Sequence, residues 1–498
     1  MQAVLTPVQM RELEERYMRE YGVPSLDLME RAAQEVSASC LELAGDKGRT
    51  AAFVCGRGGN GGDGFAAARL YAQTGGRSIV IPLYGTDSLS PDARVNCERA
   101  RGEAGVAFVD PDALDRLETP AVWVDAVFGI GYGRELDRLC ARVFRRMEVD
   151  RAAGSPVLSV DIPSGLNGLT GRADPHAVRA DRTLTFECPK PGHFLGDGLD
   201  LTGELVTAPL GIPGELLPPD ALLHYTPAQA LAELPLRPRN SHKGQYGHLL
   251  IVAGSRGMAG AAQLCAMAAL ASGAGLVTLA VPASLLPILQ IGVPCAMAVP
   301  LPEAGGVLSQ EAVPLLEKAM EGKNAVAIGP GLGRADPEVV GCVLRSGLPT
   351  VLDADALNLM ARHGELRDLL SRRHLITPHP GEAARLLGAP VTSPLEALER
   401  LLEFGAAAVL KGASCLMGGE GTYIRTCGSS GMAKGGSGDV LTGMIGALLA
   451  QGLSTGKAAR IGAAIHGRAG EIAARRMGEM AMTPLDMIAS LGEAWTVD

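Results

Sequence analysis

Short apolar runs alternate with longer amphipathic segments along most of this chain. In the first half, the runs that predict strands are 50–55, 78–83, 106–109, 121–127, 156–161 and 182–187. In the second half they are 248–253, 276–281, 325–328, 350–352, 374–376 and 407–410. Helical patterns lie between them, so each half predicts a parallel sheet with helices on both faces. Ligands bind such sheets at the carboxyl ends of the strands.

A proline-rich segment with little periodicity separates the two halves. It covers residues 211–239, and its composition is typical of a domain boundary. A chain of 498 residues is also longer than one ordinary hydrophobic core requires. We therefore predict two α/β domains, at residues 1–218 and 219–498.

Composition and charge narrow the class of protein. The chain is 47% hydrophobic and 20% charged, with a net charge of −9, which is typical of a globular protein and argues against nucleic acid as a partner. Residues 257–302 carry no charge, but glycines and prolines divide them into pieces too short to cross a membrane. The ten cysteines are scattered without a CxxC pair, which favours reduced thiols in the cytoplasm.

A glycine-rich stretch at 431–443, GMAKGGSGDVLTG, has the strongest chemical signal. Gly435, Gly436 and Gly438 lead directly into an apolar helical pattern, and a helix start of this kind binds anions through free N–H groups. Asp439 stands at the same helix start, where a carboxylate would repel a phosphate. A base that takes the proton of an attacking hydroxyl explains it, so the stretch predicts phosphoryl transfer.

Other strands of the second half also end in polar or glycine-rich motifs. No GxxxxGK[ST] loop is present, which disfavours P-loop chemistry. Each motif alone is typical of an ordinary turn, but together they favour a ligand site. The motifs are Gly329 to Gly333, Asp353 and Asp355, His379 between two prolines, and Lys411.

In the first half, a glycine run from Gly56 to Gly64 follows the first strand. It contains GxGxxG, a weak signal for dinucleotide binding that also fits a tight strand-to-helix turn. Asn60, Asp125 and Ser164 follow three strands and would offer oxygen ligands to a hard cation. Asp161 and Lys190 are candidates for proton transfer.

The motifs of the first half resemble the NAD(P)H-hydrate epimerase domain, which is Rossmann-like and three-layered. They are GRGGNGGDG, VDAVFGIGYGRE, SVDIPSGLNG and FECPKPGHFLG, in that order. Gly59 stands where the family has the first of two asparagines. The resemblance implies that Asn60, Asp125 and Ser164 bind potassium and that Asp161 is a catalytic acid or base. It also implies a pocket for the hydrated cofactor made by Gly59, Asn60, Gly61, Gly62, Asp63, Gly129, Ile130, Gly131, Tyr132, Gly133, Arg134, Glu135 and Asp161.

The motifs of the second half resemble the NAD(P)H-hydrate dehydratase family, which has a ribokinase-like α/β fold. They are GSRGMAGA, GPGLG, LDADALN, TPHPGE, LKGAS and GGSGDVLTG. The resemblance implies that the hydrated cofactor contacts Ala261, Gly331, Gly333, His379 and Asp439. It implies that ADP or ATP, with Mg²⁺, contacts Lys411, Gly412, Ala413, Ser414, Cys415 and Gly438.

Together the two resemblances predict a bifunctional enzyme that repairs hydrated NADH and NADPH. The second domain would dehydrate one epimer at the expense of ADP or ATP, and the first would interconvert the epimers. We expect small-molecule substrates, no nucleic-acid or membrane partner, and a homo-oligomer. Two alternatives remain: a small-molecule kinase of the same fold, and a first domain that only binds a ligand.

Overall fold

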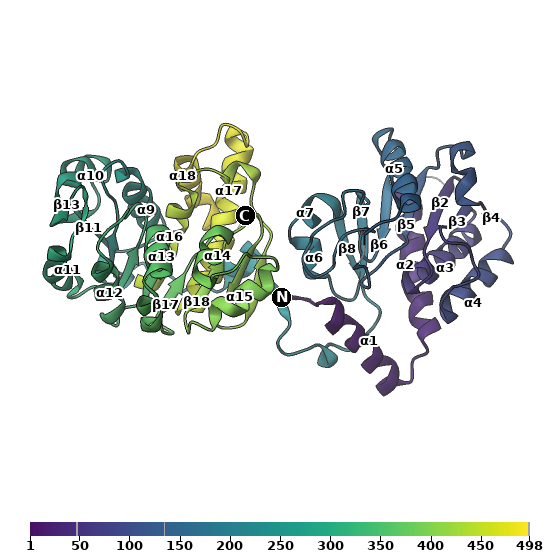
Figure 1. The fold of residues 1–498 in the computed structure, drawn as a ribbon, viewed down its shortest axis with the longest axis horizontal. Helices are drawn as coiled ribbons and strands as arrows, with labels where there is room; N and C mark the ends of the chain where they lie inside the picture. Colours follow the sequence, from purple (N-terminus) through teal and green to yellow (C-terminus); the bar gives the residue numbers. More distant parts are fainter. Residues whose placement is uncertain (46–47, 134, 497–498) are drawn as a thin grey trace. The chain divides into compact units, whose positions relative to one another are not determined.

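The computed structural model describes residues 1–45, 48–133 and 135–496 of the chain. They form two compact units, Gln2–Ala221 and Leu222–Asp498, the second of which also includes Met1. Each unit is an α/β structure in which helices cover both faces of a largely parallel sheet (Figure 1). The alternation of apolar and amphipathic segments predicted this architecture.

The first unit contains a seven-stranded parallel sheet in the order β4-β3-β2-β5-β6-β7-β8. The chain adds β3 and β4 on one side of β2, then crosses to the other side with β5. The topological switch point therefore lies between β2 and β5, where ligands bind in folds of this kind. The strands are β2 (Thr50–Cys55), β3 (Arg77–Pro82), β4 (Val106–Phe108), β5 (Val122–Ala126), β6 (Val157–Val160), β7 (Arg182–Phe186) and β8 (Glu204–Ala208).

Two hydrophobic layers hold this sheet between helices. One layer packs the first four helices against one face, and α5 (Arg138–Ala152) packs against the other (Figure 1). The first unit also contains β1 (Gln2–Val4), α1 (Pro7–Tyr21), α2 (Ser25–Ala44), α3 (Gly59–Gln73), α4 (Pro91–Arg101), α6 (Pro191–Phe194) and α7 (Gly198–Leu201). Thr6 caps α1, because its hydroxyl accepts a hydrogen bond from the Gln9 N–H while the Gln9 side chain accepts one from the Thr6 N–H.

The glycine run of the first unit forms the strand-to-helix turn after β2 and then the first turns of α3, which begins at Gly59. The glycines let this helix approach the sheet closely. A Cβ on Gly61 would lie 2.0 Å from the carbonyl oxygen of Gly56, and a Cβ on Gly64 would lie 2.5 Å from the Cβ of Ala126. Spacing in the sequence does not distinguish this packing requirement from a loop that wraps a ligand.

The second unit contains strands in the order β9-β20-β19-β18-β17-β16-β15-β10-β11-β12. The strands from β10 to β18 that belong to this sheet are parallel, while β19 and β20 form an antiparallel hairpin. The chain reverses direction along the sheet between β10 and β15. The strands are β9 (Leu222–His224), β10 (His248–Val252), β11 (Leu276–Pro282), β12 (Met297–Leu301), β15 (Ala325–Ile328), β16 (Thr350–Leu352), β17 (His374–Ile376), β18 (Ala407–Leu410), β19 (Cys415–Gly418) and β20 (Thr422–Arg425).

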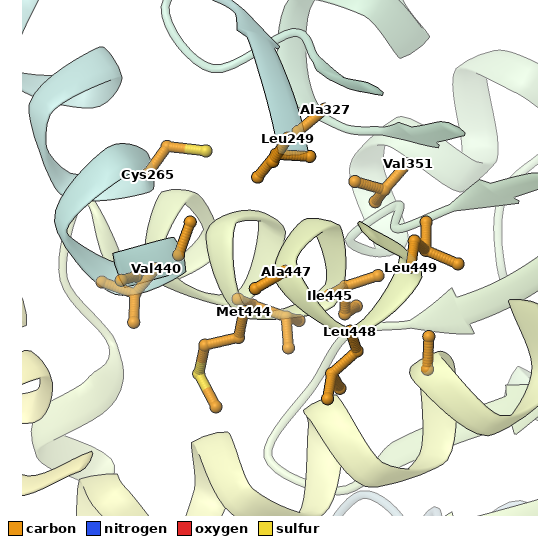
Figure 2. Packing of buried hydrophobic residues seen from close by; sticks show 14 of the residues in the cluster. Leu249, Cys265, Ala327, Val351, Val440, Met444, Ile445, Ala447, Leu448 and Leu449 are labelled. Atoms are coloured by element: carbon orange, nitrogen blue, oxygen red, sulfur yellow. The ribbon is translucent and has the colours of Figure 1, made fainter. Parts of the chain in front are cut away.

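The largest core of the second unit lies around α16 (Ser437–Ala450). Figure 2 shows Val440, Met444, Ile445 and Leu448 of this helix packed among side chains of the sheet and of other helices. The neighbouring helices on this face are α9 (Ala259–Ala271), α17 (Thr455–Met477) and α18 (Pro484–Ala494). The remaining elements are β13 (Glu303–Ala304), β14 (Val307–Leu308), α8 (Pro227–Ala232), α10 (Leu286–Gly292), α11 (Val313–Met320), α12 (Pro337–Arg345), α13 (Ala354–Arg362), α14 (Pro380–Leu387) and α15 (Pro394–Leu402). None of the helices in the described part of the chain is long and apolar enough to cross a membrane.

Candidate active sites

A cavity of about 510 Å³ opens at the switch point of the first unit. It is bounded by the start of α3, the segment after β5 and the inner faces of α1 and α2. Eight predicted pocket residues line it: Gly59, Asn60, Asp63, Gly129, Ile130, Gly131, Tyr132 and Asp161. Gly61, Gly62, Gly133 and Glu135 are not among the lining residues, and Arg134 lies outside the described residues.

Asp161 lies on the wall of this cavity directly after β6, in a left-handed backbone conformation with φ of 66°. This conformation costs a non-glycine residue about 1–3 kcal/mol. Lys190 Nζ donates a hydrogen bond to Asp161 Oδ1 at 2.5 Å, and Thr185 Oγ1 donates to the same oxygen at 3.0 Å. Lys190 is only 1% exposed. The two residues predicted to transfer protons are thus in direct contact.

His193 holds the backbone of Asp161 in place. Burial and the charge of Lys190 lower the pKa of His193 to about 4, so its ring is neutral at pH 7. The ring Nε2 lies 2.9 Å from the carbonyl oxygen of Asp161, and Nδ1 accepts a hydrogen bond from the Lys190 N–H at 3.1 Å. Nε2 must therefore donate. Both ring nitrogens are occupied, and His193 acts as a positioning residue.

Asp125 and Ser164 form a buried polar cluster beside the cavity. Ser164 Oγ donates to Asp125 Oδ1 at 2.6 Å, and Ser159 Oγ donates to Oδ2 at 2.9 Å. Burial raises the pKa of Asp125, while the hydrogen bonds from Ser164 and Ser159 oppose the shift. No Lys or Arg in the described ranges forms an ion pair with this carboxylate. The third predicted metal ligand, Asn60, lies against Gly129, where an added Cβ would be 3.4 Å from the amide carbon.

Glu14 also lines the cavity, and the sequence motifs did not indicate it. It lies on α1, four residues after the buried Met10, so the signal was an acidic residue on the buried face of an amphipathic helix. Burial raises the pKa of Glu14 to about 7, Lys190 lowers it and Asp161 raises it. Asp63 lies in the same cluster, since burial and the charges of Asp161 and Glu14 raise its pKa well above the usual range.

The second unit has its candidate site at the carboxyl ends of β15, β16 and β18, around Asp353. This carboxylate is 1% exposed. Lys411 Nζ lies 2.6 Å from its Oδ1, and Thr442 Oγ1 donates to its Oδ2 at 2.7 Å. Lys411 also lies 3.8 Å from Glu382. The nearby carboxylates raise the pKa of Lys411 despite its burial, so it remains an ammonium.

The glycine-rich stretch forms the N-terminus of α16, next to this ion pair. Gly436 has φ of 102°, which glycine adopts readily, and the helix begins at Ser437. The N–H groups of Gly438 and Asp439 have no hydrogen-bond partner within the part of the chain that the structure describes. A Cβ on Gly438 would lie 3.3 Å from Lys411 Nζ and 3.4 Å from Asp353 Oδ2. Free N–H groups, a helix dipole and an ammonium therefore meet at one point, which suits an anion.

His466 anchors this loop from below. Burial lowers its pKa to about 3, so the ring is neutral. Its Nε2 lies 2.9 Å from the carbonyl oxygen of Ser437 and donates to it. On the exposed side, Lys434 Nζ donates to the carbonyl oxygens of Met480 and Met482. The loop is thus held at both ends independently of a ligand.

Asp439 has the electrostatic environment of a general base. Desolvation is the largest effect on its pKa, and the negative charge of Asp353 adds to it, while Lys411 opposes both. The resulting pKa is about 7, compared with 3.8 for an ordinary aspartate. A base is most effective when its pKa is near the working pH.

The other residues predicted for this site lie around the same strand ends. Gly331 has φ of 59°, and an added Cβ would lie 2.9 Å from the Cβ of Ala261. The Gly333 N–H donates to Asp355 Oδ2 at 2.8 Å. His379 Nε2 lies 3.5 Å from Glu382, which itself reaches Lys411.

The segment after β18 completes the set of predicted nucleotide contacts. Gly412 and Ala413 are exposed, and Ser414 Oγ is buried without a hydrogen-bond partner in the structure. Cys415 begins β19 and receives a hydrogen bond from the buried Arg425. The Ser414 hydroxyl can therefore form a hydrogen bond with a ligand, whereas the Cys415 side chain already forms one with Arg425.

Both units thus place charged groups at the strand ends of a parallel sheet, and together they define a two-domain α/β enzyme. One domain has a cofactor-sized cavity with buried carboxylates, and the other combines an anion-binding helix start with a base. Residues 249–492 match the model of the NAD(P)H-hydrate dehydratase family, and residues 25–192 match the model described as YjeF-related protein N-terminus.

Full-length relatives carry both parts. The chain is 38% identical to the bifunctional NAD(P)H-hydrate repair enzyme Nnr of Moorella thermoacetica, with 97% of this chain and 95% of the relative covered. It is 35% identical to the protein of that name from Escherichia coli, with 94% and 89% covered. The chain belongs to the family of bifunctional NAD(P)H-hydrate repair enzymes, as the two motif series predicted.

A solved structure is also similar to the second unit. It is the ADP/ATP-dependent NAD(P)H-hydrate dehydratase from Bacillus subtilis, co-crystallized with ATP/Mg²⁺. The sequences are 28% identical, the TM-score is 0.46, and the match covers 55% of this chain and 98% of that one.

Proposed function

We propose that residues 219–498 dehydrate the S-form of hydrated NADH or NADPH by phosphorylating its hydroxyl group, at the expense of ADP or ATP. The observation that carries this proposal is the meeting of Asp439, the free N–H groups of the α16 start and the Lys411–Asp353 pair. A hydroxyl is a poor leaving group, and phosphorylation makes it a good one. The ring nitrogen of the hydrated nicotinamide then supplies the electron pair that expels phosphate.

Asp439 is the base in this proposal. It removes the proton from the substrate hydroxyl as the oxygen attacks the terminal phosphoryl group. The N–H groups of Gly438 and Asp439 and the ammonium of Lys411 stabilise the negative charge of the phosphoryl oxygens. Ala261, Gly331, Gly333 and His379 are proposed to contact the hydrated cofactor.

The nucleotide is expected to contact Gly438 and residues 411–415, where Ser414 has an unused hydroxyl. Magnesium, when bound, would bridge the phosphates and neutralise part of their charge. The described residues contain no group of three or more His, Cys, Asp or Glu that could hold a metal.

The first domain, residues 1–218, is proposed to interconvert the R- and S-forms so that both can be repaired. Its cavity would hold the hydrated nicotinamide, with Gly59 to Asp63 and residues 129–135 around it and Asp161 as acid or base. Potassium is proposed at Asn60, Asp125 and Ser164. The buried Asp125 has no cationic partner in the described ranges, and its oxygen-rich surroundings suit a hard cation.

Two further properties belong to this proposal. A cytoplasmic location is consistent with ten cysteines, none of which forms a disulfide. A homo-oligomer is also expected, and light scattering of the purified protein measures it.

The decisive experiment uses chemically hydrated NADH, which contains both epimers. The full-length protein is incubated with this mixture, Mg²⁺ and either ADP or ATP, while reduced-nicotinamide absorbance and inorganic phosphate are followed. The proposal predicts that absorbance returns completely and that one phosphate is released per cofactor repaired. A stable phosphorylated product without absorbance would instead support a small-molecule kinase, and recovery of only one epimer would refute the role of the first domain.

A further inference from the structure

The epimerase reaction requires two proton transfers, one to the oxygen that leaves one face of a ring carbon and one from the oxygen that adds to the other face. In the hydrate, the hydroxyl is bonded to the ring carbon next to the nitrogen. When the C–O bond breaks, the nitrogen lone pair forms a C=N bond, and water then adds to the opposite face. One group must protonate the departing hydroxyl, and another must deprotonate the incoming water. Asp161 can supply only one of these two groups, so a second one is needed.

Glu14 is a second carboxyl group on the wall of the cavity that Asp161 lines. The charges that act on Glu14 are those of Lys190, Asp161, Arg11 and Glu15. Its own charge and that of Asp161 both act on Asp63, and all three carboxyl groups line the cavity. No hydrogen bond or ion pair joins the Glu14 carboxyl to another described residue. Its oxygens are therefore available to a ligand.

The two carboxyl groups have opposite environments. Asp161 Oδ1 receives hydrogen bonds from Lys190 Nζ and Thr185 Oγ1. Asp161 Oδ2 has no partner among the described residues, so it can accept a proton. Glu14 lacks such donors, and burial raises its pKa to about 7, so about half of it is protonated at pH 7. Two carboxyl groups with divergent environments are the usual arrangement of an acid and a base.

The neighbouring groups are less suited to this role. Lys190 is committed to Asp161 and Thr185, and both nitrogens of His193 are engaged by the backbone. Asp63, in the first turns of α3, also lines the cavity, and burial and the charges of Asp161 and Glu14 raise its pKa well above the usual range. Asp92 also lines the cavity, from the start of α4, but it does not act on Asp63 as Glu14 and Asp161 do.

We propose that Glu14 is the second acid–base group of the epimerase site and works in tandem with Asp161. The inference rests on the epimerase function proposed for this cavity. Protonated Glu14 gives its proton to the hydroxyl, the C–O bond breaks, and water leaves. Water attacks the other face of the C=N bond, its oxygen bonds to carbon, and its proton passes to Asp161. Asp161 then releases this proton to solvent, and Glu14 takes one up from solvent, which restores the starting state. In the opposite direction, Asp161 is the acid and Glu14 is the base.

The test is Glu14→Gln, which keeps the shape of the side chain and removes the exchangeable acid. Glu15→Gln is the matched control, because Glu15 is the exposed next residue of the same helix. Purified R-epimer is incubated with full-length protein without nucleotide, and the appearance of S-epimer is measured by chromatography, with the uncatalysed rate subtracted. We expect kcat to fall by about 10²–10⁴-fold in Glu14→Gln with KM changed by less than about threefold. Glu15→Gln should behave as wild type, and Glu14→Asp should recover part of the activity.

The pH profile separates a proton-transfer role from a structural one. In wild type, kcat/KM for epimerisation should fall above about pH 7 as Glu14 loses its proton, and Glu14→Gln should lack this limb. Unchanged thermal unfolding shows that the variant is folded. If Glu14→Gln retains wild-type kcat, or keeps the upper limb, the inference is wrong while the epimerase function stands. If wild type itself does not interconvert the epimers, the function proposed for the first domain is wrong as well.

Discussion

Replacing Asp439 by Asn tests the chemistry of the second site most directly. The amide has the shape of the carboxyl but cannot take the proton of the substrate hydroxyl. Because general-base catalysis contributes about 10²–10⁴-fold, we expect nucleotide-dependent repair to fall by at least that factor. Epimerisation should stay near wild type, since the proposed epimerase residues all lie in the first unit.

The same substitution should stabilise the protein, and the structure gives the size of the effect. The folded pKa of Asp439 is about 7, compared with 3.8 for an ordinary aspartate, so the folded state binds this proton more tightly than the unfolded state. Stability is therefore lost as pH rises from about 4 to 7. With about 1.36 kcal/mol per pKa unit, the ionised carboxylate costs about 4 kcal/mol at pH 8 and about 2 kcal/mol at pH 5. These values are upper bounds on the gain in Asp439→Asn.

The assay compares thermal and urea unfolding of wild type and Asp439→Asn at pH 5 and pH 8, alongside repair of purified S-epimer. The variant should have the larger free energy of unfolding, and the difference should be larger at pH 8. A variant that loses stability at pH 8 would contradict the assigned electrostatics. Full retention of repair would refute Asp439 as the base, whatever the stability shows.

Three further predictions concern the two sites. For repair of the S-epimer, kcat/KM should fall about tenfold per pH unit below pH 7, because Asp439 must be ionised; a profile that stays flat from pH 5.5 to 8 would contradict this. Asp161→Asn should stop consumption of the R-epimer and leave dehydration of the S-epimer intact; equal loss of both activities would indicate a folding defect instead. Asp125→Asn should remove stimulation of epimerisation by potassium, measured against sodium at equal ionic strength, while Ser159→Ala should retain it.

Much of the fold could be predicted from local signals. Apolar runs are a direct consequence of strands buried on both faces, which is why the strands at 325–328, 350–352, 374–376 and 407–410 have the predicted ends. The start of α16 was predictable as well, because it follows from neighbouring residues in the sequence: glycines directly before an apolar helical pattern. The helical state of Gly59 was not, because it depends on how closely α3 packs against β2 and β5.

The sequence by itself determined which chemical groups the two sites contain and which family they resemble. This is because residue types and their spacing along the chain do not depend on how the chain folds. Only the tertiary structure brought Lys411 and Thr442 to Asp353, across 58 and 89 residues. Burial of the neighbouring Asp439, with the negative charge of Asp353, raises its pKa to about 7, although Lys411 opposes the shift. The tertiary structure also placed Glu14, from the first helix, and Asp161 on the wall of one cavity. Desolvation and Coulomb interactions depend on distance in space, and a linear pattern does not contain that distance.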